Sequence, residues 1–294
     1  MPVLSSVEGL SLNGNRGTMT STLSQALLAA HYRGLDRLDA QILLLHALGR
    51  STQDRAWLIA HDEDPMDAAT LEDFDALANR RAAGEPIAYL LGHKEFFGLD
   101  LAVDRRVLVP RPDTETLVEW ALDLLAGVAT PRILDLGTGS GAIALALLSR
   151  RPDAQVEATD LSADALDVAR ANAERLELPL RLRQAAWLDA AADGWSLIAS
   201  NPPYIPDADP HLPALAHEPR TALASGKDGL RDIRTIVAQA VPHLAPGGWL
   251  LLEHGWDQAE AVRGLLEQAG FRHVASRRDL AGIERASGGQ RPAA

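Results

Sequence analysis

The sequence predicts an α/β protein whose doubly wound sheet follows a small helical domain. From Pro131 onward, short apolar runs alternate with segments of helical periodicity, which is typical of a mainly parallel sheet with helices on both faces. Residues 20–92 show helical spacing alone, and residues 94–109 change to the two-residue period of strands. These three periods predict a helical bundle, a β-hairpin and a sheet domain, in that order.

The helices of the first domain are predicted from its leucine spacing. Apolar residues recur at helical intervals near residues 23–28 and 38–48. A third helix is expected over about 68–83, because a glycine and a proline follow it. We therefore predict a helical domain over residues 19–92, after a disordered extension over residues 1–18.

A β-hairpin is expected over residues 93–110, as a linker between the two domains. Apolar side chains alternate along it, with Gly98 interrupting the pattern, at Phe97, Leu99, Leu101 and Val103. Pro110 and Pro112 end the hairpin. Asp113 is then placed to cap a helix that runs to about Leu125.

The sheet domain is expected over residues 111–287. Strands are predicted at 132–136, 155–159, 180–184, 195–200 and 249–253, with a final strand pair from 271. Helices are predicted at 142–150, 162–176, 228–243 and 257–269. This order gives seven strands in an open sheet. Residues 288–294 are expected to form a flexible tail.

The composition excludes several classes of protein. The 294 residues contain no cysteine, so disulfides and thiolate metal sites are excluded, and no other metal site is expected. No apolar run is long enough to span a membrane, and the N-terminal residues lack the pattern of a signal peptide. The net charge of −12 argues against direct nucleic-acid binding, which depends on neutralising phosphates. We expect a cytoplasmic monomer.

A glycine-rich loop separates the first sheet strand from its helix. Gly137, Gly139 and Gly141 allow the backbone to approach a ligand closely. Asp160, at the end of the next strand, is placed to accept hydrogen bonds from ribose hydroxyls, whether the nucleoside belongs to NAD or to S-adenosylmethionine. Asp135 would repel a pyrophosphate and suit a ligand with an ammonium and a sulfonium. It therefore favours S-adenosylmethionine.

Asn201, Pro202, Pro203 and Tyr204 follow an apolar strand at its carboxyl end, where open α/β sheets bind ligands. The two prolines cannot donate backbone hydrogen bonds. An amide side chain, carbonyl acceptors and an aromatic face remain, and together they suit a planar NH2 group. The Asn201 side-chain oxygen and the Pro202 carbonyl can each accept one N–H, while Tyr204 packs flat against the group.

With these motifs in place, the chain closely resembles the release factor glutamine methyltransferases, the HemK/PrmC family, from about Thr20 to Arg285. Matching segments are 84–90, 110–115, 137–141, 201–204, 218–223 and 252–255. Pro-Arg-Pro-Asp-Thr-Glu at 110–115 is the most specific of them. The resemblance implies a seven-stranded, Rossmann-like class I methyltransferase domain. It also implies methyl transfer from S-adenosylmethionine to the side-chain nitrogen (N5) of the glutamine in the Gly-Gly-Gln motif of peptide chain release factors.

Site residues are carried over from this resemblance position by position. The cofactor is expected to contact Gly137, Thr138, Gly139, Ser140, Gly141, Asp160, Trp187 and Asn201. The target glutamine is expected to contact Asn201, Pro202, Pro203 and Tyr204, with catalytic roles for Asn201, Pro202 and Tyr204. The helical domain would dock the release factor. One departure is Ala186, which stands where the family's pattern has an acidic residue that often holds the adenine amino group.

Two other functions stay open on the residues alone. An adenine-N6 methyltransferase acting on DNA or RNA shares the Asn-Pro-Pro-aromatic pattern, because a flipped adenine also presents a planar NH2; the acidic charge disfavours it. A non-catalytic cofactor-binding adaptor is disfavoured by the intact tetrapeptide. Glu253 and His254 end a strand, and we expect them to be structural. Gly288-Gly289-Gln290 repeats the target tripeptide, so self-methylation of Gln290 is the alternative to a plain flexible end.

Overall fold

The computed structural model describes residues 21–189 and 191–293, in two compact units that divide after Ala83. The extension predicted over residues 1–18 lies outside the described residues. The division comes before the predicted boundary at residue 92, because α5 (Ile87–Leu91) packs with the second unit. Its Tyr89 side chain is buried, and the Tyr89 hydroxyl donates a hydrogen bond to the Val107 carbonyl.

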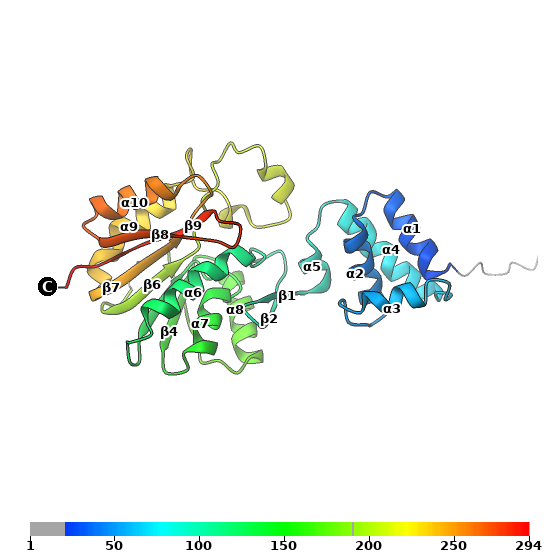
Figure 1. Cartoon of the computed structure of the whole chain (residues 1–294), viewed down its shortest axis with the longest axis horizontal. Helices are drawn as coiled ribbons and strands as arrows, with labels where there is room; N and C mark the ends of the chain where they lie inside the picture. Colours follow the sequence, from blue (N-terminus) through cyan, green and yellow to red (C-terminus); the bar gives the residue numbers. More distant parts are fainter. Residues whose placement is uncertain (1–20, 190, 294) are drawn as a thin grey trace, which may run out of the picture. The chain divides into compact units, whose positions relative to one another are not determined.

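The first unit is a bundle of short helices, as predicted (Figure 1). They are α1 (Leu23–Tyr32), α2 (Arg37–Ala47), α3 (Arg55–Ala60) and α4 (Ala68–Ala82). Thr22 opens α1 with a capping box, in which its side chain accepts from the Gln25 N–H and the Gln25 side chain accepts from the Thr22 N–H. Leucines of α2 and Phe74 of α4 are fully buried between the helices. The residues of α3 show no clear helical period, and its single buried residue is Leu58.

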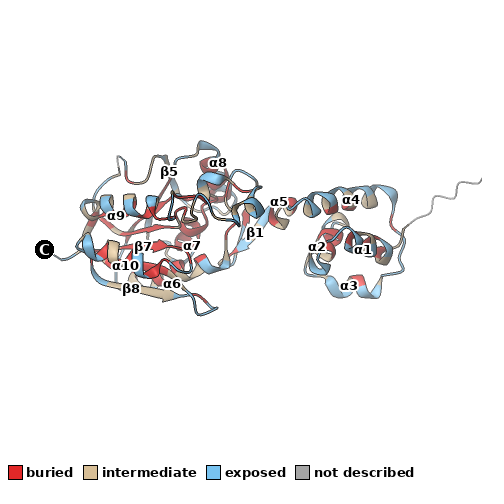
Figure 2. Cartoon of the chain, turned by 90° about the horizontal axis from the view of Figure 1, so that it is seen from above, coloured by how far each residue is buried: buried red, intermediate tan, exposed pale blue. Residues whose placement is uncertain are grey.

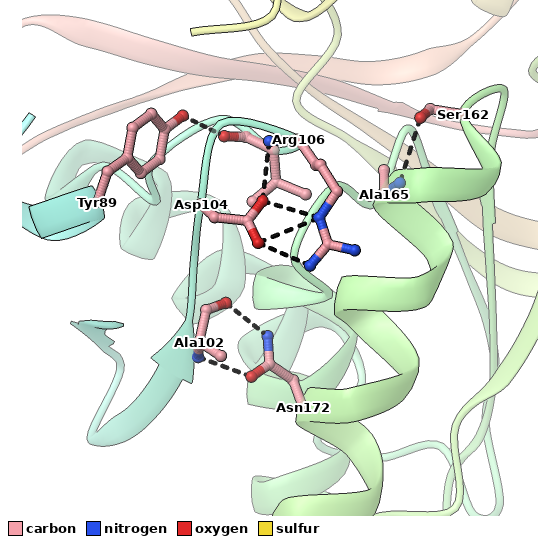
Figure 3. A network of polar contacts seen from close by, with 8 residues as sticks. Tyr89, Ala102, Asp104, Arg106, Ser162, Ala165 and Asn172 are labelled. Carbon is pink, nitrogen blue, oxygen red and sulfur yellow. Dashed lines mark hydrogen bonds and ion pairs between the residues drawn. The ribbon is translucent and has the colours of Figure 1, made fainter. Parts of the chain in front are cut away.

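The linker hairpin is real but shorter than predicted. β1 (His93–Phe96) and β2 (Leu99–Ala102) pair antiparallel. Phe97, predicted to lie in a strand, is in the turn with a φ of 52°, followed by Gly98 at 82°. The Asn172 side chain donates to the Ala102 carbonyl and accepts from its N–H, at 3.0 and 2.7 Å (Figure 3). This pair of bonds fastens the hairpin to the sheet domain.

The second unit contains the predicted seven-stranded sheet, in the order β5-β4-β3-β6-β7-β9-β8. The first five strands in this order are parallel, and β9 runs antiparallel to both of its neighbours. Their bounds are β3 (Arg132–Leu136), β4 (Gln155–Asp160), β5 (Arg181–Gln184), β6 (Trp195–Ser200), β7 (Leu244–Glu253), β8 (Arg272–Arg278) and β9 (Glu284–Gln290). The strand order reverses between β3 and β6, so a crevice opens there at the carboxyl ends.

Helices cover both faces of this sheet, which confirms the doubly wound arrangement (Figures 1 and 2). They are α6 (Glu115–Leu124), α7 (Ala142–Arg150), α8 (Ala163–Arg175), α9 (Arg231–His243) and α10 (Ala259–Gln268). Alternate residues of one strand face opposite layers: Ile133 joins the core with α6 and α7, and Leu134 joins the core with α9 and α10. Within the described residues, we find no helix that has both the length and the apolar character to cross a bilayer.

Two predictions about the ends of the sheet domain are wrong. Residues 288–290 belong to β9 instead of a flexible tail, and Gln290 donates from its side chain to the Gly247 carbonyl at 2.8 Å. A Cβ at Gly288 would lie 2.3 Å from a Leu251 methyl, so this glycine permits close packing between strands. Asp113 does not cap α6. It lies in the 3-10 turn Pro112–Thr114 and pairs with Arg285 at 3.4 Å.

Candidate active site

The glycine loop runs from β3 into α7 and is hydrogen-bonded to the end of β4. Gly137, Gly139 and Gly141 have φ values of 68°, 56° and 86°, in the left-handed region that glycine adopts without strain. The Gly139 N–H donates to one oxygen of Asp160 at 2.9 Å, and the Ser162 N–H donates to the other at 2.9 Å. Two backbone donors therefore fix the Asp160 carboxylate, while its remaining lone pairs stay available to a ligand.

A cleft of about 580 Å³ opens beside this loop. Of the predicted site residues, those that line it are Gly137, Gly139, Asp160, Trp187, Asn201 and Pro203. Those that do not line it are Thr138, Ser140, Gly141, Pro202 and Tyr204. Of these, Thr138 and Ser140 are buried within the loop itself.

Trp187 packs closely on the glycine loop. A Cβ at Gly137 would lie 3.3 Å from the indole ring of Trp187, so a larger residue there would displace the ring. Ala186 and the preceding Ala185 line the cleft where an acidic side chain was expected. Their side chains offer no acceptor, so any polar contact to a base at this place falls to backbone groups.

The sequence prediction missed two walls of the cleft. One is the segment after β2, which contributes Arg106, Val107 and Leu108. The Arg106 guanidinium is held by the Asp104 carboxylate, with a shortest contact of 2.6 Å (Figure 3). The other wall comes from the loop after the tetrapeptide, with residues 219–222 and 224. The second wall overlaps the segment 218–223 that matches the family, and that match was the available signal; residues 106–108 lie outside the matching segments.

Asp135 lies beneath the glycine loop and is fully buried. One of its oxygens accepts from the Thr138 hydroxyl at 2.6 Å, and the other has no hydrogen-bond partner among the described residues. Burial raises the pKa of Asp135 to about 7. An unpaired buried carboxylate oxygen close to the loop, together with the acceptor atoms of Asp160, fits a ligand that carries positive charge and sugar hydroxyls.

Asn201 to Tyr204 follow β6 directly, as predicted. The Ser200 hydroxyl donates to the Leu136 carbonyl at 2.7 Å, which ties this strand end to the glycine loop. The Asn201 side-chain nitrogen donates to the Thr114 hydroxyl oxygen at 3.2 Å, and among the described residues Asn201 Oδ1 is left as a free acceptor. The Tyr204 hydroxyl donates to the Glu253 carboxylate at 3.3 Å.

Glu253 and His254 differ in what they contact. The His254 ring is buried, and its two nitrogens contact the Gly255 carbonyl at 2.9 Å and the Ser287 hydroxyl at 2.8 Å. This arrangement is structural. Glu253 faces the tetrapeptide instead, and burial raises its pKa to about 7.

A glycine loop, a carboxylate at the next strand end and an Asn-Pro-Pro-Tyr turn at the switch point of this strand order together define a class I methyltransferase. Residues 22–92 match the family described as the PrmC N-terminal domain, and residues 114–269 match the methyltransferase small domain. The chain belongs to the release factor glutamine methyltransferase family, as the sequence resemblance predicted.

Curated relatives match over almost their full length. The release factor glutamine methyltransferase of Bordetella pertussis is 55% identical over 272 residues, which cover 91% of this chain and 99% of that one. The corresponding protein of Vibrio cholerae is 44% identical over 283 residues, covering 92% and 98%.

Solved structures with lower identity share the fold. A methyltransferase from Pyrococcus furiosus is 21% identical, with a TM-score of 0.51 over 73% of this chain and 99% of that one. The hMettl16 catalytic domain in complex with MAT2A 3'UTR hairpin 1 is 18% identical, with a TM-score of 0.55 over 72% and 80%. These two likenesses show the fold alone.

Proposed function

We propose that this chain transfers a methyl group from S-adenosylmethionine to N5 of the glutamine in the Gly-Gly-Gln motif of peptide chain release factors. Membership of the family supports the reaction. The single observation that supports the site is the orientation of Asn201, whose nitrogen is engaged by Thr114 and whose oxygen is left for a substrate N–H.

The residues that would hold the cofactor are Gly137, Gly139, Asp160 and Trp187. When bound, S-adenosylmethionine supplies an electrophilic methyl group. Asp160, fixed by two backbone N–H groups, would receive the ribose hydroxyls. Asp135 does not line the cleft, and from beneath the glycine loop its unpaired oxygen would favour positive charge on the ligand.

An amide nitrogen is a weak nucleophile, because its lone pair is delocalised into the carbonyl. The site must therefore orient the NH2 group and stabilise the positive charge that grows on it. Asn201 Oδ1 and the Pro202 carbonyl would each accept one N–H, and such fixed dipoles need little reorganisation during reaction. Tyr204 would pack against the amide plane. The product amide then loses a proton readily, so no strong base is required.

The helical unit would dock the release factor. Leu28 and Tyr32 of α1 are 52% and 80% exposed and lie one helical turn apart. Exposed apolar side chains at this spacing are suited to a protein surface. We further propose a cytoplasmic monomer that makes no direct contact with nucleic acid, in line with the net charge of −12.

The proposal is tested by incubating the protein with labelled S-adenosylmethionine and either an intact release factor or DNA and RNA. Label is expected in the release factor, and mass spectrometry should place it on the Gly-Gly-Gln glutamine. A release factor with alanine at that glutamine is the matched control and should stay unlabelled. Label in nucleic acid would instead support the adenine-N6 alternative. Cofactor binding without transfer to either substrate would support an adaptor.

A further inference from the structure

We propose that Glu253 is a positioning residue for methyl transfer: acting through Thr114, it determines which end of the Asn201 amide faces the substrate. The inference rests on the proposed function and adds to it a residue that does not line the cleft. Glu253 is the last residue of β7, whereas Asn201 follows β6 and Thr114 precedes α6. The three residues are far apart in sequence, and the fold brings them together.

The first observation is the burial of the Glu253 carboxylate next to the Tyr204 hydroxyl. Glu253 is only 1% exposed. Its Oε1 accepts from the Tyr204 hydroxyl, and its Oε2 has no hydrogen-bond partner of standard geometry among the described residues. The Thr114 hydroxyl is nonetheless close enough to lower the pKa of Glu253 partly. The Thr114 hydroxyl is therefore a neighbour of the Glu253 carboxylate.

The second observation is the direction of the Asn201–Thr114 hydrogen bond. The Asn201 nitrogen is the donor and the Thr114 oxygen the acceptor. A hydroxyl has one hydrogen, and here that hydrogen is free to point toward the Glu253 carboxylate. An ionised carboxylate can only accept. It therefore favours the order in which Asn201 donates to Thr114 and Thr114 donates to Glu253, and this order leaves Asn201 Oδ1 for the substrate.

A glutamine at position 253 would have the same shape and would not impose this order. Its NH2 could donate to Thr114, whose hydrogen would then point at Asn201. The Asn201 amide would rotate to accept it and would present its own NH2 to the cleft. Two NH2 groups would then face each other, and the substrate nitrogen would lose an acceptor.

Several groups surround the carboxylate. Burial raises the pKa of Glu253 to about 7; Thr114, Arg285 and Tyr204 lower it, and Asp113 raises it. His254, the next residue, directs both ring nitrogens to other partners. Since the proposed order needs the ionised form, turnover should rise with pH through the region of this pKa and then level off.

The test compares Glu253→Gln with the wild-type protein on an intact release factor. We expect kcat to fall about 10²-fold, the typical cost of losing one oriented polar group in an active site. The dissociation constant of S-adenosylmethionine should stay close to the wild-type value. The fall of kcat toward low pH, expected for the wild type, should disappear in this variant. Glu157→Gln is the matched control, because that carboxylate lies on β4 against Arg183 and does not line the cleft.

A pair of variants at Thr114 tests the relay itself. Thr114→Val removes the hydroxyl and should lower kcat to the same order as Glu253→Gln. Thr114→Ser keeps the hydroxyl and should restore most of the rate. If the double variant with Glu253→Gln is no worse than either single one, the two residues act through one chain of hydrogen bonds.

Hydrogen exchange gives a readout that needs no turnover. The Asn201 side-chain NH2, assigned in a nitrogen-15 spectrum with Asn201→Asp, should be protected in the wild type and lose protection in Glu253→Gln and Thr114→Val. Unchanged protection in both variants, or unchanged kcat in Glu253→Gln on a substrate that the wild type methylates, would overturn the inference. A wild type that methylates no release factor would instead contradict the proposed function, and the exchange measurement would still decide the role of Glu253.

Discussion

The backbone N–H of Val109 donates a hydrogen bond to the Glu218 carboxylate over 3.1 Å. The second oxygen of this carboxylate accepts from the Arg111 guanidinium at 2.5 Å. Glu218 is buried, and the residues beside it and beside Val109 form the two cleft walls that the sequence prediction missed. One carboxylate therefore joins the segment after the hairpin to the loop after the tetrapeptide.

Glu218→Ala should loosen both walls. The buried Val109 N–H would lose its acceptor, which costs about 1–3 kcal/mol in the free energy of unfolding. Affinity for S-adenosylmethionine should fall as well, because Val107 and Leu108 lose their support. Urea denaturation and calorimetric titration measure the two effects. Glu119→Ala, an exposed site on α6, should change stability by no more than about 0.5 kcal/mol. Equal stability of the two variants would contradict the assigned role of Glu218.

Asn201→Ala should abolish methyl transfer while leaving cofactor binding largely intact. The side chain supplies one acceptor for the substrate NH2, and its loss should cost at least about 10²-fold in kcat. Single-turnover transfer to a release factor measures the chemical step, and equilibrium titration measures the cofactor. Retained turnover would remove Asn201 from the mechanism.

Gly288→Ala should destabilise the sheet. The added Cβ would lie 2.3 Å from a Leu251 methyl and 2.8 Å from the Leu250 carbonyl oxygen, so β9 would have to move. Overpacking of this kind costs about 1–3 kcal/mol or more. Gly264→Ala on α10 is the control: no heavy atom lies within 4 Å of its Cβ position, and helix propensity should stabilise it by about 0.5–1 kcal/mol. Thermal denaturation distinguishes the two, and a stable Gly288→Ala would show that the strands can separate.

Gln290 should stay unmethylated in purified protein incubated with cofactor. Its side-chain nitrogen is engaged by the Gly247 carbonyl within the sheet, and so is not presented to the cleft. Mass spectrometry of the C-terminal peptide checks this. A modified peptide would show that the end of β9 detaches.

Glu253→Gln should flatten the dependence of stability on pH. Burial raises the pKa of Glu253 from 4.5 to about 7, so between these values the folded chain keeps a proton that the unfolded chain releases. The free energy of unfolding must therefore fall as pH rises through this window. Asp135, with its pKa also raised to about 7, leaves a residual slope in the variant. Urea titrations across the window give both slopes, and identical slopes would show that Glu253 is not desolvated.

Elements with strong periodicity were predicted well. The apolar runs that became β3 and β6 needed no tertiary information, because strands buried on both faces read as nearly continuous apolar segments. α3 was missed because a six-residue helix with one buried side chain has no detectable period. The flexible tail was a wrong prediction because glycines indicate both loose chain ends and close strand packing, and only the neighbouring strand distinguishes the two.

The sequence by itself determined the class of fold, the glycine loop and the tetrapeptide at a strand end, since each depends on residues that are contiguous in the chain. The tertiary structure alone decided how the tetrapeptide is held. Asn201 meets Thr114, and Tyr204 meets Glu253, only after α6, β6 and β7 have packed. The direction of a hydrogen bond depends on every group that shares the buried site, and local sequence carries no record of those groups.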